Sequence, residues 1–371
     1  MKIKKSLTIA LAYLGVIVGA GFASGKEIEQ YYVSFGSQGL WGAVLSTFIY
    51  GLTGYIALQM GSFYKAQDHH SVLKNIAPSF ISKLFDWILT LTLFLLGLTM
   101  IAGGGSNLNQ QFGLATWVGS LLAAVIIILA GYFNVEKVTQ LIGYLTPLIV
   151  VFFIIIPIYS YFTMDLSLAE VNLLSSDLVQ TLPNWVVSAF NHVSLNFMLV
   201  FSMATVMGGN EEDIRTASIG GGMGGVWTGL LQLLGYLAIF LRIEVAGGTA
   251  MPLLALAQDM HPIVGLFMAV TIYIMIISTA IGMVYPLAQR IYNMITPKES
   301  FYSRKKFTYI LIVCVLLGFL ASFSGFEVLV AYVYPVIGYS GFILMGVLLF
   351  AWIRNFKDYH TKSENRQQAS K

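Results

Sequence analysis

The sequence predicts an all-α integral membrane protein with ten transmembrane helices. Of its 371 residues, 57% are hydrophobic and 10% are charged, and the mean hydropathy is +0.78. Soluble domains carry about 25% charged residues, and a helix needs about 20 mostly apolar residues to cross a bilayer. Apolar stretches of this length recur along the whole chain. The predicted spans cover residues 6–33, 40–63, 84–105, 115–133, 138–162, 184–208, 216–241, 262–290, 307–325 and 328–353.

The positive charges support this count and orient the chain. When the N-terminus is placed in the cytoplasm, all but two of the 20 lysines and arginines fall in cytoplasmic segments, the exceptions being Lys26 and Arg242. Cytoplasmic loops of membrane proteins carry such an excess. We therefore expect both termini in the cytoplasm, a single transmembrane domain over residues 1–353 and a polar cytoplasmic tail over 354–371. The outer loop 244–259 is predicted to form a short helix after a glycine turn.

The first span contains a cluster of glycines at its middle. The cluster comprises Gly15, Gly19, Gly21 and Gly25. Glycine costs about 1 kcal/mol against alanine in a helix, and the charged pair Lys26-Glu27 follows at once. This pattern predicts a helix that stops and restarts inside the membrane, where freed amides attract an anionic group and freed carbonyls attract a cation. Close packing between helices is the alternative interpretation of the glycines.

A second group of polar residues lies in the middle of the sixth span. It consists of Asn191, His192, Ser194 and Asn196. Polar groups in hydrocarbon are costly unless they have partners, so we expect them to face the interior at a second helix break. Two interrupted helices at corresponding positions predict an inverted repeat of five plus five spans, over residues 6–162 and 184–353, with the binding site between the halves. His192 could contact the solute or carry a proton. The alternative is a neutral histidine that bonds two interior groups.

The eighth span carries adjacent hydroxyls at Ser278 and Thr279, one turn after the carbonyl of Met275. Together with the carbonyls of Gly15 and Val18 at the predicted break, they would supply five oxygens, the ligand type that hard cations prefer. This arrangement predicts a Na⁺ site. The alternative is that both hydroxyls bond back to their own helix, as such residues often do.

The glycines also carry a family resemblance. Gly15, Gly19 and Gly21 match the Gly-x-x-x-Gly-x-Gly pattern of the first span in the LeuT fold, which neurotransmitter:sodium symporters share with the amino acid–polyamine–organocation superfamily. The chain as a whole, and residues 18–27 in particular, resembles the YkvI-like bacterial membrane proteins. The resemblance implies a bacterial plasma-membrane location. It also implies that the ion site uses two carbonyls of span one and the Ser/Thr pair of span eight.

Two departures from the family pattern bear on the coupling ion. Phe22 stands where sodium symporters of the neurotransmitter type place asparagine, so a second Na⁺ beside the solute is not expected. Some proton-coupled relatives carry a lysine in span five, but residues 138–162 contain neither lysine nor arginine, which favours Na⁺. Proton coupling through His192 or Glu27 stays open.

These features predict a secondary active transporter, a Na⁺-coupled symporter of a small amino-acid-like or amine solute that works by alternating access. The solute carboxylate is expected on the amides of Gly19, Ala20 and Gly21, up to Ser24. The amine or polar head is expected on Asn191, His192 and Asn196. The alternatives are a proton-coupled transporter or exchanger of the same fold, and a nutrient sensor that binds solute without moving it.

Other functional classes lack their motifs in this sequence. The glycine runs 103–105 and 220–222 have no Lys-Ser/Thr ending, so they are packing or hinge glycines rather than phosphate loops. No HExxH motif and no nucleophile–base pair indicates an enzyme. The expected partners are a small solute and the lipid bilayer, with no nucleic acid and no cofactor apart from the coupling ion. The sequence makes no prediction of the oligomeric state.

Overall fold

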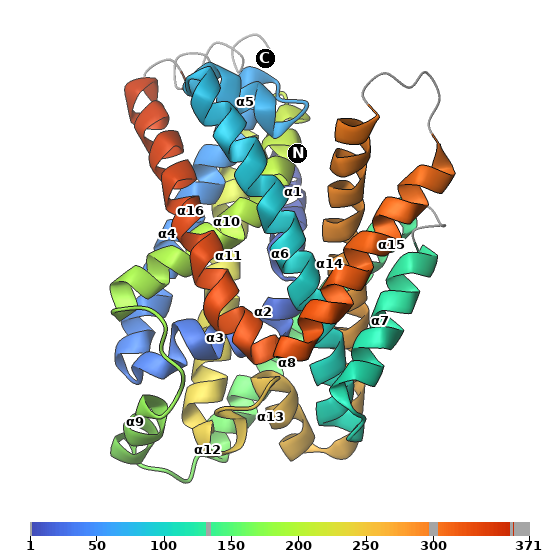
Figure 1. Cartoon of the computed structure of the whole chain (residues 1–371). Helices are drawn as coiled ribbons and strands as arrows, with labels where there is room; N and C mark the ends of the chain where they lie inside the picture. Colours follow the sequence, from blue (N-terminus) through green and yellow to red (C-terminus); the bar gives the residue numbers. More distant parts are fainter. Residues whose placement is uncertain (1, 131–134, 297–302, 357–358, 360–371) are drawn as a thin grey trace.

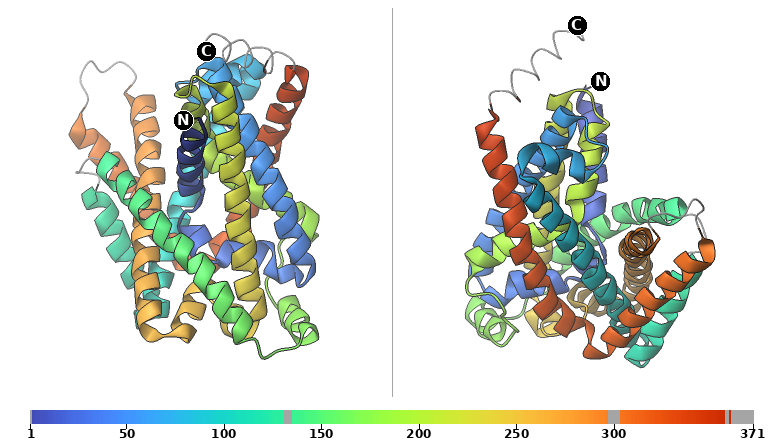
Figure 2. Two further views of the ribbon diagram at one scale, coloured as in Figure 1. Left: turned by 180° about the vertical axis from the view of Figure 1, so that it is seen from behind. Right: turned by 45° about the horizontal axis from the view of Figure 1, so that its top comes forward.

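The computed structural model of the chain describes residues 2–130, 135–296, 303–356 and 359, and these form a helical bundle without strands (Figures 1 and 2). The helices of the first half are α1 (Lys2–Ile17), α2 (Ala20–Ser24), α3 (Lys26–Tyr31), η1 (Val33–Phe35), α4 (Gln38–Tyr64), α5 (His69–Ile76), α6 (Ser79–Phe112), α7 (Thr116–Ala130) and α8 (Val135–Phe162). Those of the second half are α9 (Leu168–Ser176), α10 (Trp185–Gly209), α11 (Ile214–Leu241), α12 (Ile243–Ala246), α13 (Pro252–Met260), α14 (Pro262–Ile295), α15 (Arg304–Ala321), η2 (Ser322–Ser324) and α16 (Phe326–Arg354).

Seven elements in the described residues are long and apolar enough to cross a bilayer, so the chain is a multi-pass membrane protein. They are α4, α6, α10, α11, α14, α15 with η2, and α16. Shorter apolar helices cover 116–130 and 147–162. Large apolar side chains face outward along the long helices, and Trp41 and Phe48 are 62% and 70% exposed. Such a surface suits lipid rather than water. Every predicted span coincides with at least one helix, but the count of ten crossings stays a prediction.

The first span is discontinuous, as its glycines predicted. Helix α1 ends at Ile17, the backbone is extended at Gly19 (φ −91°, ψ −173°), and α2 begins at the next residue. The Gly19 amide donates to the Ile17 carbonyl at 2.6 Å instead of reaching back to Gly15, as a continued helix would require. A second glycine, Gly25, then adopts φ +82° between α2 and α3, a left-handed conformation that glycine alone adopts without strain.

The predicted break in the sixth span is wrong. Helix α10 runs without interruption through His192. The physical reason is that residues 185–207 contain neither glycine nor proline, and the polar side chains find partners that leave the helical backbone intact. The Asn196 amide donates to the His192 carbonyl of its own helix at 3.1 Å, and the Ser194 hydroxyl donates to the Gly338 carbonyl of α16 at 2.6 Å. Polar residues inside a membrane helix therefore mark tertiary contacts here, not a break.

Glycines bring α4, α10 and α11 into close contact. A Cβ atom at Gly54 would overlap the carbonyl oxygen of Gly221, and a Cβ at Gly221 would overlap that of Gly54. A Cβ at Gly61 of α4 would likewise overlap the Thr205 carbonyl oxygen of α10. Backbone-to-backbone approach of this kind is the usual role of small residues in membrane helices. It confirms the interpretation of the 220–222 glycine run as a packing element.

Different short helices lie at the two ends of the bundle. The start of α1, the end of α16 and the short helix α5 lie at one end, whereas α9, α12 and α13 lie at the other (Figure 1). Helix α13 follows a glycine turn in which Gly248 has φ +73°, which confirms the short helix predicted within 244–259. Most of the predicted polar tail 354–371 lies outside the described residues.

Candidate functional site

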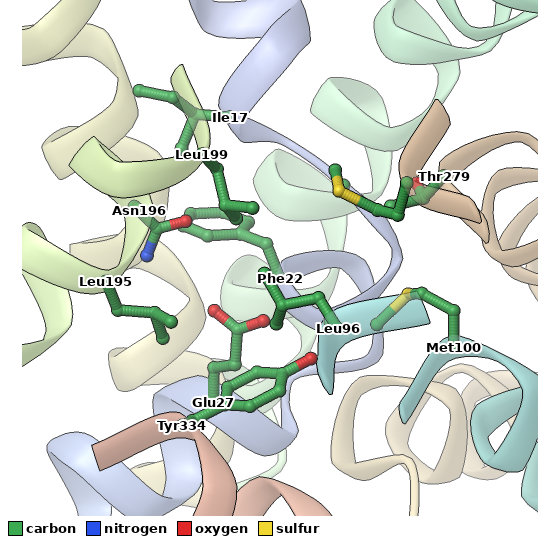
Figure 3. A pocket seen from close by; sticks show the side chains of 13 residues that line it. Ile17, Phe22, Glu27, Leu96, Met100, Leu195, Asn196, Leu199, Thr279 and Tyr334 are labelled. Atoms are coloured by element: carbon green, nitrogen blue, oxygen red, sulfur yellow. The ribbon is translucent and has the colours of Figure 1, made fainter. Parts of the chain in front are cut away.

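The break in the first span opens onto a small cavity (Figure 3). Its volume is about 30 Å³, and a single water needs about 10–15 Å³ on this measure, so the cavity has room for about two water molecules. Figure 3 shows Asn196 and Thr279 on opposite sides of the cavity and Glu27 beside Tyr334. The lining residues are Ile17, Gly19, Gly21, Phe22, Glu27, Leu96, Met100, Leu195, Asn196, Leu199, Thr279, Met283 and Tyr334.

Glu27 is the one acidic side chain among the residues that line the cavity. It starts from α3 and folds back over α2, and only 6% of the residue is exposed. A Cβ at Gly21 would overlap Glu27 Oε1 and would lie 3.0 Å from Glu27 Cδ and 3.2 Å from Tyr334 Oη. The missing side chain at Gly21 therefore makes room for this carboxylate. This carboxyl group lies where the sequence predicted the carboxylate of a solute.

Glu27 is paired with His192 of α10. Glu27 Oε2 lies 3.1 Å from His192 Nε2, and the histidine is fully buried. The other ring nitrogen, Nδ1, lies 2.9 Å from Tyr32 Oη and 3.1 Å from Gln232 Oε1. Tyr31 stacks on the imidazole at a centroid distance of 4.7 Å. The ring is thus held on every polar edge, and it forms the second layer behind the cavity rather than its wall.

Lys26, the neighbour of Glu27, is directed elsewhere. Its Nζ lies 2.6 Å from Glu29 Oε1 and donates to the Thr249 carbonyl at 3.0 Å. The pairing follows from helical geometry, because residues three apart lie on the same face whereas adjacent residues do not. The lysine charge is therefore balanced by Glu29 and does not neutralise Glu27.

The other residues predicted to bind solute have different surroundings. Gly19, Gly21 and Asn196 line the cavity, and Ala20 is the first residue of α2. Ser24 is used locally, since its hydroxyl donates to the Gly21 carbonyl at 2.7 Å.

Asn191 lies outside the cavity wall and joins three elements. It accepts from Tyr31 Oη at 3.0 Å and donates to the Pro335 carbonyl of α16 at 3.0 Å. The structure therefore brings three of the predicted solute contacts to the cavity wall and assigns Ser24 and Asn191 to the surrounding framework.

One of the predicted ion ligands, Thr279, lies at the same break. The Thr279 hydroxyl would lie 3.6 Å from a Cβ at Gly19, and Ser278 and Met275 are 2% and 0% exposed. In the described part of the chain, neither the Ser278 nor the Thr279 hydroxyl takes part in a hydrogen bond. By contrast, Thr271 of the same helix bonds back to the Phe267 carbonyl at 2.7 Å. Thr271 thus shows the back-bonding that was the alternative for the Ser/Thr pair, whereas the pair itself makes no such bond among the described residues.

Several residues of the site were not singled out by the sequence. Tyr32 and Gln232 hold His192, and Tyr334, Leu96 and Met100 line the cavity. Gln232 offered a signal, because a glutamine in the apolar stretch of α11 must find a partner in the protein. The tyrosines and the apolar residues offered none, since the same residue types recur on lipid-facing surfaces of this chain.

The fold is that of known membrane transporters. The structure resembles Mhp1 in an inward-facing conformation (TM-score 0.64, 13% identity, 94% of this chain and 76% of that one). It also resembles MhsT in complex with L-phenylalanine (TM-score 0.63, 16% identity, 96% and 91%) and a Na⁺-coupled sialic acid symporter (TM-score 0.59, 14% identity, 93% and 78%). At these identities the likeness establishes the fold, and the chain therefore has the LeuT fold that its glycine pattern predicted.

Comparison with known sequences identifies relatives of the chain. No family model matches the chain. It is 26% identical over 353 residues to the Bacillus subtilis (strain 168) protein "Uncharacterized protein YyaD", covering 94% of this chain and 97% of the relative. It is 21% identical over 348 residues to "Uncharacterized membrane protein YkvI" of the same organism, covering 92% and 94%. The predicted resemblance to YkvI-like membrane proteins of the LeuT fold is confirmed.

Proposed function

We propose that this chain is a secondary active transporter that moves a small cationic amine or guanidine through the cavity at the break of its first span. The observation that carries the proposal is the buried Glu27 carboxylate, which meets the cavity at Gly21. The sequence left an amino-acid-like solute and an amine as alternatives. A solute carboxylate beside Gly21 would face the carboxylate of Glu27, and two such groups in one desolvated site disfavour each other's charge. A cationic head has no such conflict.

The proposed architecture is ten spans in a five-plus-five arrangement within one domain of residues 1–353. Seven elements meet the length and hydropathy of a span. The interrupted α1–α3 segment, α7 and α8 would supply the other three. Both termini would be cytoplasmic, in the cell membrane of a bacterium, which places α5 at the inner end and α13 at the outer end of the bundle.

We further propose Na⁺ as the coupling ion. Its ligands would be the carbonyls of Gly15, Val18 and Met275 and the hydroxyls of Ser278 and Thr279. The support is local, because the break releases the Gly15 carbonyl from its helical amide and the two hydroxyls have no hydrogen-bond partner among the described residues. An ion that bridges α1 and α14 would favour one arrangement of these helices over the other. Such differential binding is what couples an ion gradient to transport.

A thermal-shift screen of the purified protein identifies the solute. Small amines, guanidines and amino acids are tested in NaCl and in choline chloride, since a solute at 100 times its Kd stabilises the native state by about 2.7 kcal/mol. Cationic compounds without a carboxylate are expected to stabilise, and more strongly in NaCl. Uptake and counterflow of the best compound in proteoliposomes then separate a transporter from a sensor. Binding without counterflow would replace transport by nutrient sensing.

The sodium site has a matched pair of variants in α14. Loss of a hydroxyl ligand to an ion costs about 1.5–3 kcal/mol, so Thr279→Ala is expected to raise the Na⁺ concentration for half-maximal uptake about tenfold or more. Thr271→Ala is the control, because its hydroxyl is already bonded to the Phe267 carbonyl. Uptake that is unchanged in choline chloride, in wild type and in Ser278→Ala, would remove Na⁺ coupling from the proposal.

A further inference from the structure

We propose that the Glu27–His192 pair is a proton-binding site, and that one proton on this pair and one compact cation in the adjoining cavity replace each other. The inference rests on the proposed function for the kind of cargo. It adds a second ion, the proton, and the residues that bind it. Its basis is the geometry of the pair, the hydrogen bonds of the histidine and the balance of charges around Glu27.

The histidine has partners for two protonation states. When both ring nitrogens carry a proton, Nδ1 donates to Gln232 Oε1 and Nε2 donates to Glu27, while the Tyr32 hydroxyl is within 2.7 Å of Ser46 Oγ and can donate there. When only Nε2 carries a proton, Nδ1 accepts from the Tyr32 hydroxyl at 2.9 Å. A hydroxyl can donate or accept, whereas an amide oxygen only accepts. One proton therefore enters or leaves without stranding either ring nitrogen.

The two states differ in charge by one unit. With the proton, a carboxylate faces an imidazolium and the pair is neutral; without it, the pair carries −1. The ionisable groups on the surrounding elements do not change this count. Lys26 and Glu29 balance each other at 2.6 Å. Glu327 at the start of α16 acts on Glu29 and is exposed. The other groups around the pair are tyrosines, whose ordinary pKa of about 10 keeps them neutral near pH 7; among the described residues they include Tyr31, Tyr32, Tyr50 and Tyr334.

A net charge in this buried place is costly, so the missing positive charge must be supplied. The two oxygens of the Glu27 carboxylate have different neighbours. Oε2 lies within hydrogen-bond distance of His192, whereas Oε1 faces Gly21, a residue of the cavity wall. A cation in the cavity can therefore restore neutrality when the proton leaves. The balance is one proton released to the solvent for each cation bound, with no change in the net charge of the site.

Guanidinium and urea are matched probes for this exchange, because they have nearly the same planar shape and differ by one charge. Calorimetric titration of the full-length protein in micelles, in two buffers of different ionisation enthalpy, gives the number of protons released on binding. Guanidinium is expected to bind at millimolar concentration and to release up to one proton. Its Kd should fall about tenfold for each unit of rising pH, until the pair has lost its proton. Urea is expected to give no binding at the same concentration.

Two variants of α3 separate the pair from its surroundings. Glu27→Gln is expected to abolish both guanidinium binding and proton release. The double variant Lys26→Met, Glu29→Gln is the matched control on the same short helix, because it removes both charges of the balanced pair. It is expected to keep both binding and proton release, even where its thermal stability falls. The pH series on the wild-type protein needs no variant, so the test holds if Glu27→Gln does not fold.

The inference is overturned if guanidinium binds at no pH between 5 and 9, or if it binds without releasing protons at every pH in that range. It is also overturned if Glu27→Gln exchanges as the wild type does. These outcomes are distinct from failure of the proposed function. Proton release in micelles without counterflow in vesicles would remove transport and keep the exchange. Counterflow without proton release would keep transport and remove the exchange.

Discussion

Replacing Gly21 by alanine tests the arrangement of the site with one methyl group. The new Cβ would overlap Glu27 Oε1 and lie 3.0 Å from Glu27 Cδ and 3.2 Å from Tyr334 Oη. Carbon atoms pack at about 3.5–4.0 Å, so the end of the Glu27 side chain must move away by roughly 1 Å or more. Because the other oxygen of this carboxylate lies 3.1 Å from His192 Nε2, we expect the shift to weaken that contact.

The expected cost follows from the interaction that is lost. A hydrogen bond to a charged group contributes about 1.5–3 kcal/mol, and replacing glycine by alanine within a helix returns about 0.5–1 kcal/mol. The Gly21→Ala protein is therefore expected to be less stable by about 1–2 kcal/mol. Its affinity for guanidinium should fall about tenfold or more, since a factor of ten corresponds to about 1.4 kcal/mol.

Thiol labelling during heating measures this stability, because the chain has one cysteine, Cys314, and it is buried. The dye reacts only as the fold opens. Gly282→Ala is the control, since a Cβ at Gly282 in α14 meets no atom within 4 Å. It is expected to label at the wild-type temperature or slightly above it.

A double-mutant cycle identifies the cause. In a Glu27→Ala background the overlapping carboxylate is gone, so Gly21→Ala is expected to cost little, and the two effects should not add. The reasoning is refuted if Gly21→Ala leaves both labelling temperature and guanidinium affinity unchanged. It is equally refuted if the full loss of stability persists in the Glu27→Ala background.

Two further predictions concern the framework. Gly208→Ala in α10 would place a Cβ against the Leu58 carbonyl of α4. Because the backbone cannot move aside as a side chain can, we expect a loss of about 1–3 kcal/mol in stability, measured by thiol labelling. Gly346→Ala is the control, since its Cβ meets open space and should leave the stability unchanged. Asp68 caps α5, and its hydrogen bonds from Ser71 lower the pKa of its carboxyl below the ordinary 3.8. The cap is thus fully effective above that ordinary value and is lost as the pH falls through the lowered pKa. Hydrogen exchange of residues 69–76 should quicken on this descent, and Asp68→Ala should remove the pH dependence together with about 1 kcal/mol of local stability.

The sequence alone predicted the features that depend on neighbouring residues. Apolar stretches of membrane length predict helices because unpaired backbone groups are intolerable in lipid. The glycines at 15, 19, 21 and 25 predicted the interrupted first span, because helix propensity is a local property and glycine lowers it wherever it stands. The short helix after the turn at Gly248 followed from the same kind of evidence.

Only the tertiary structure decided how polar groups are paired. Asn196, Ser194 and His192 predicted a break in α10, yet each of these side chains has partners that leave the helix whole. The partner of Glu27 is His192, 165 residues away in the chain, and Lys26 forms its ion pair with Glu29. A polar residue in a membrane helix needs a hydrogen-bond or ion-pair partner, but any suitable group within reach can serve as that partner. Which group that is depends on how α3, α10 and α11 pack, and no local pattern encodes this.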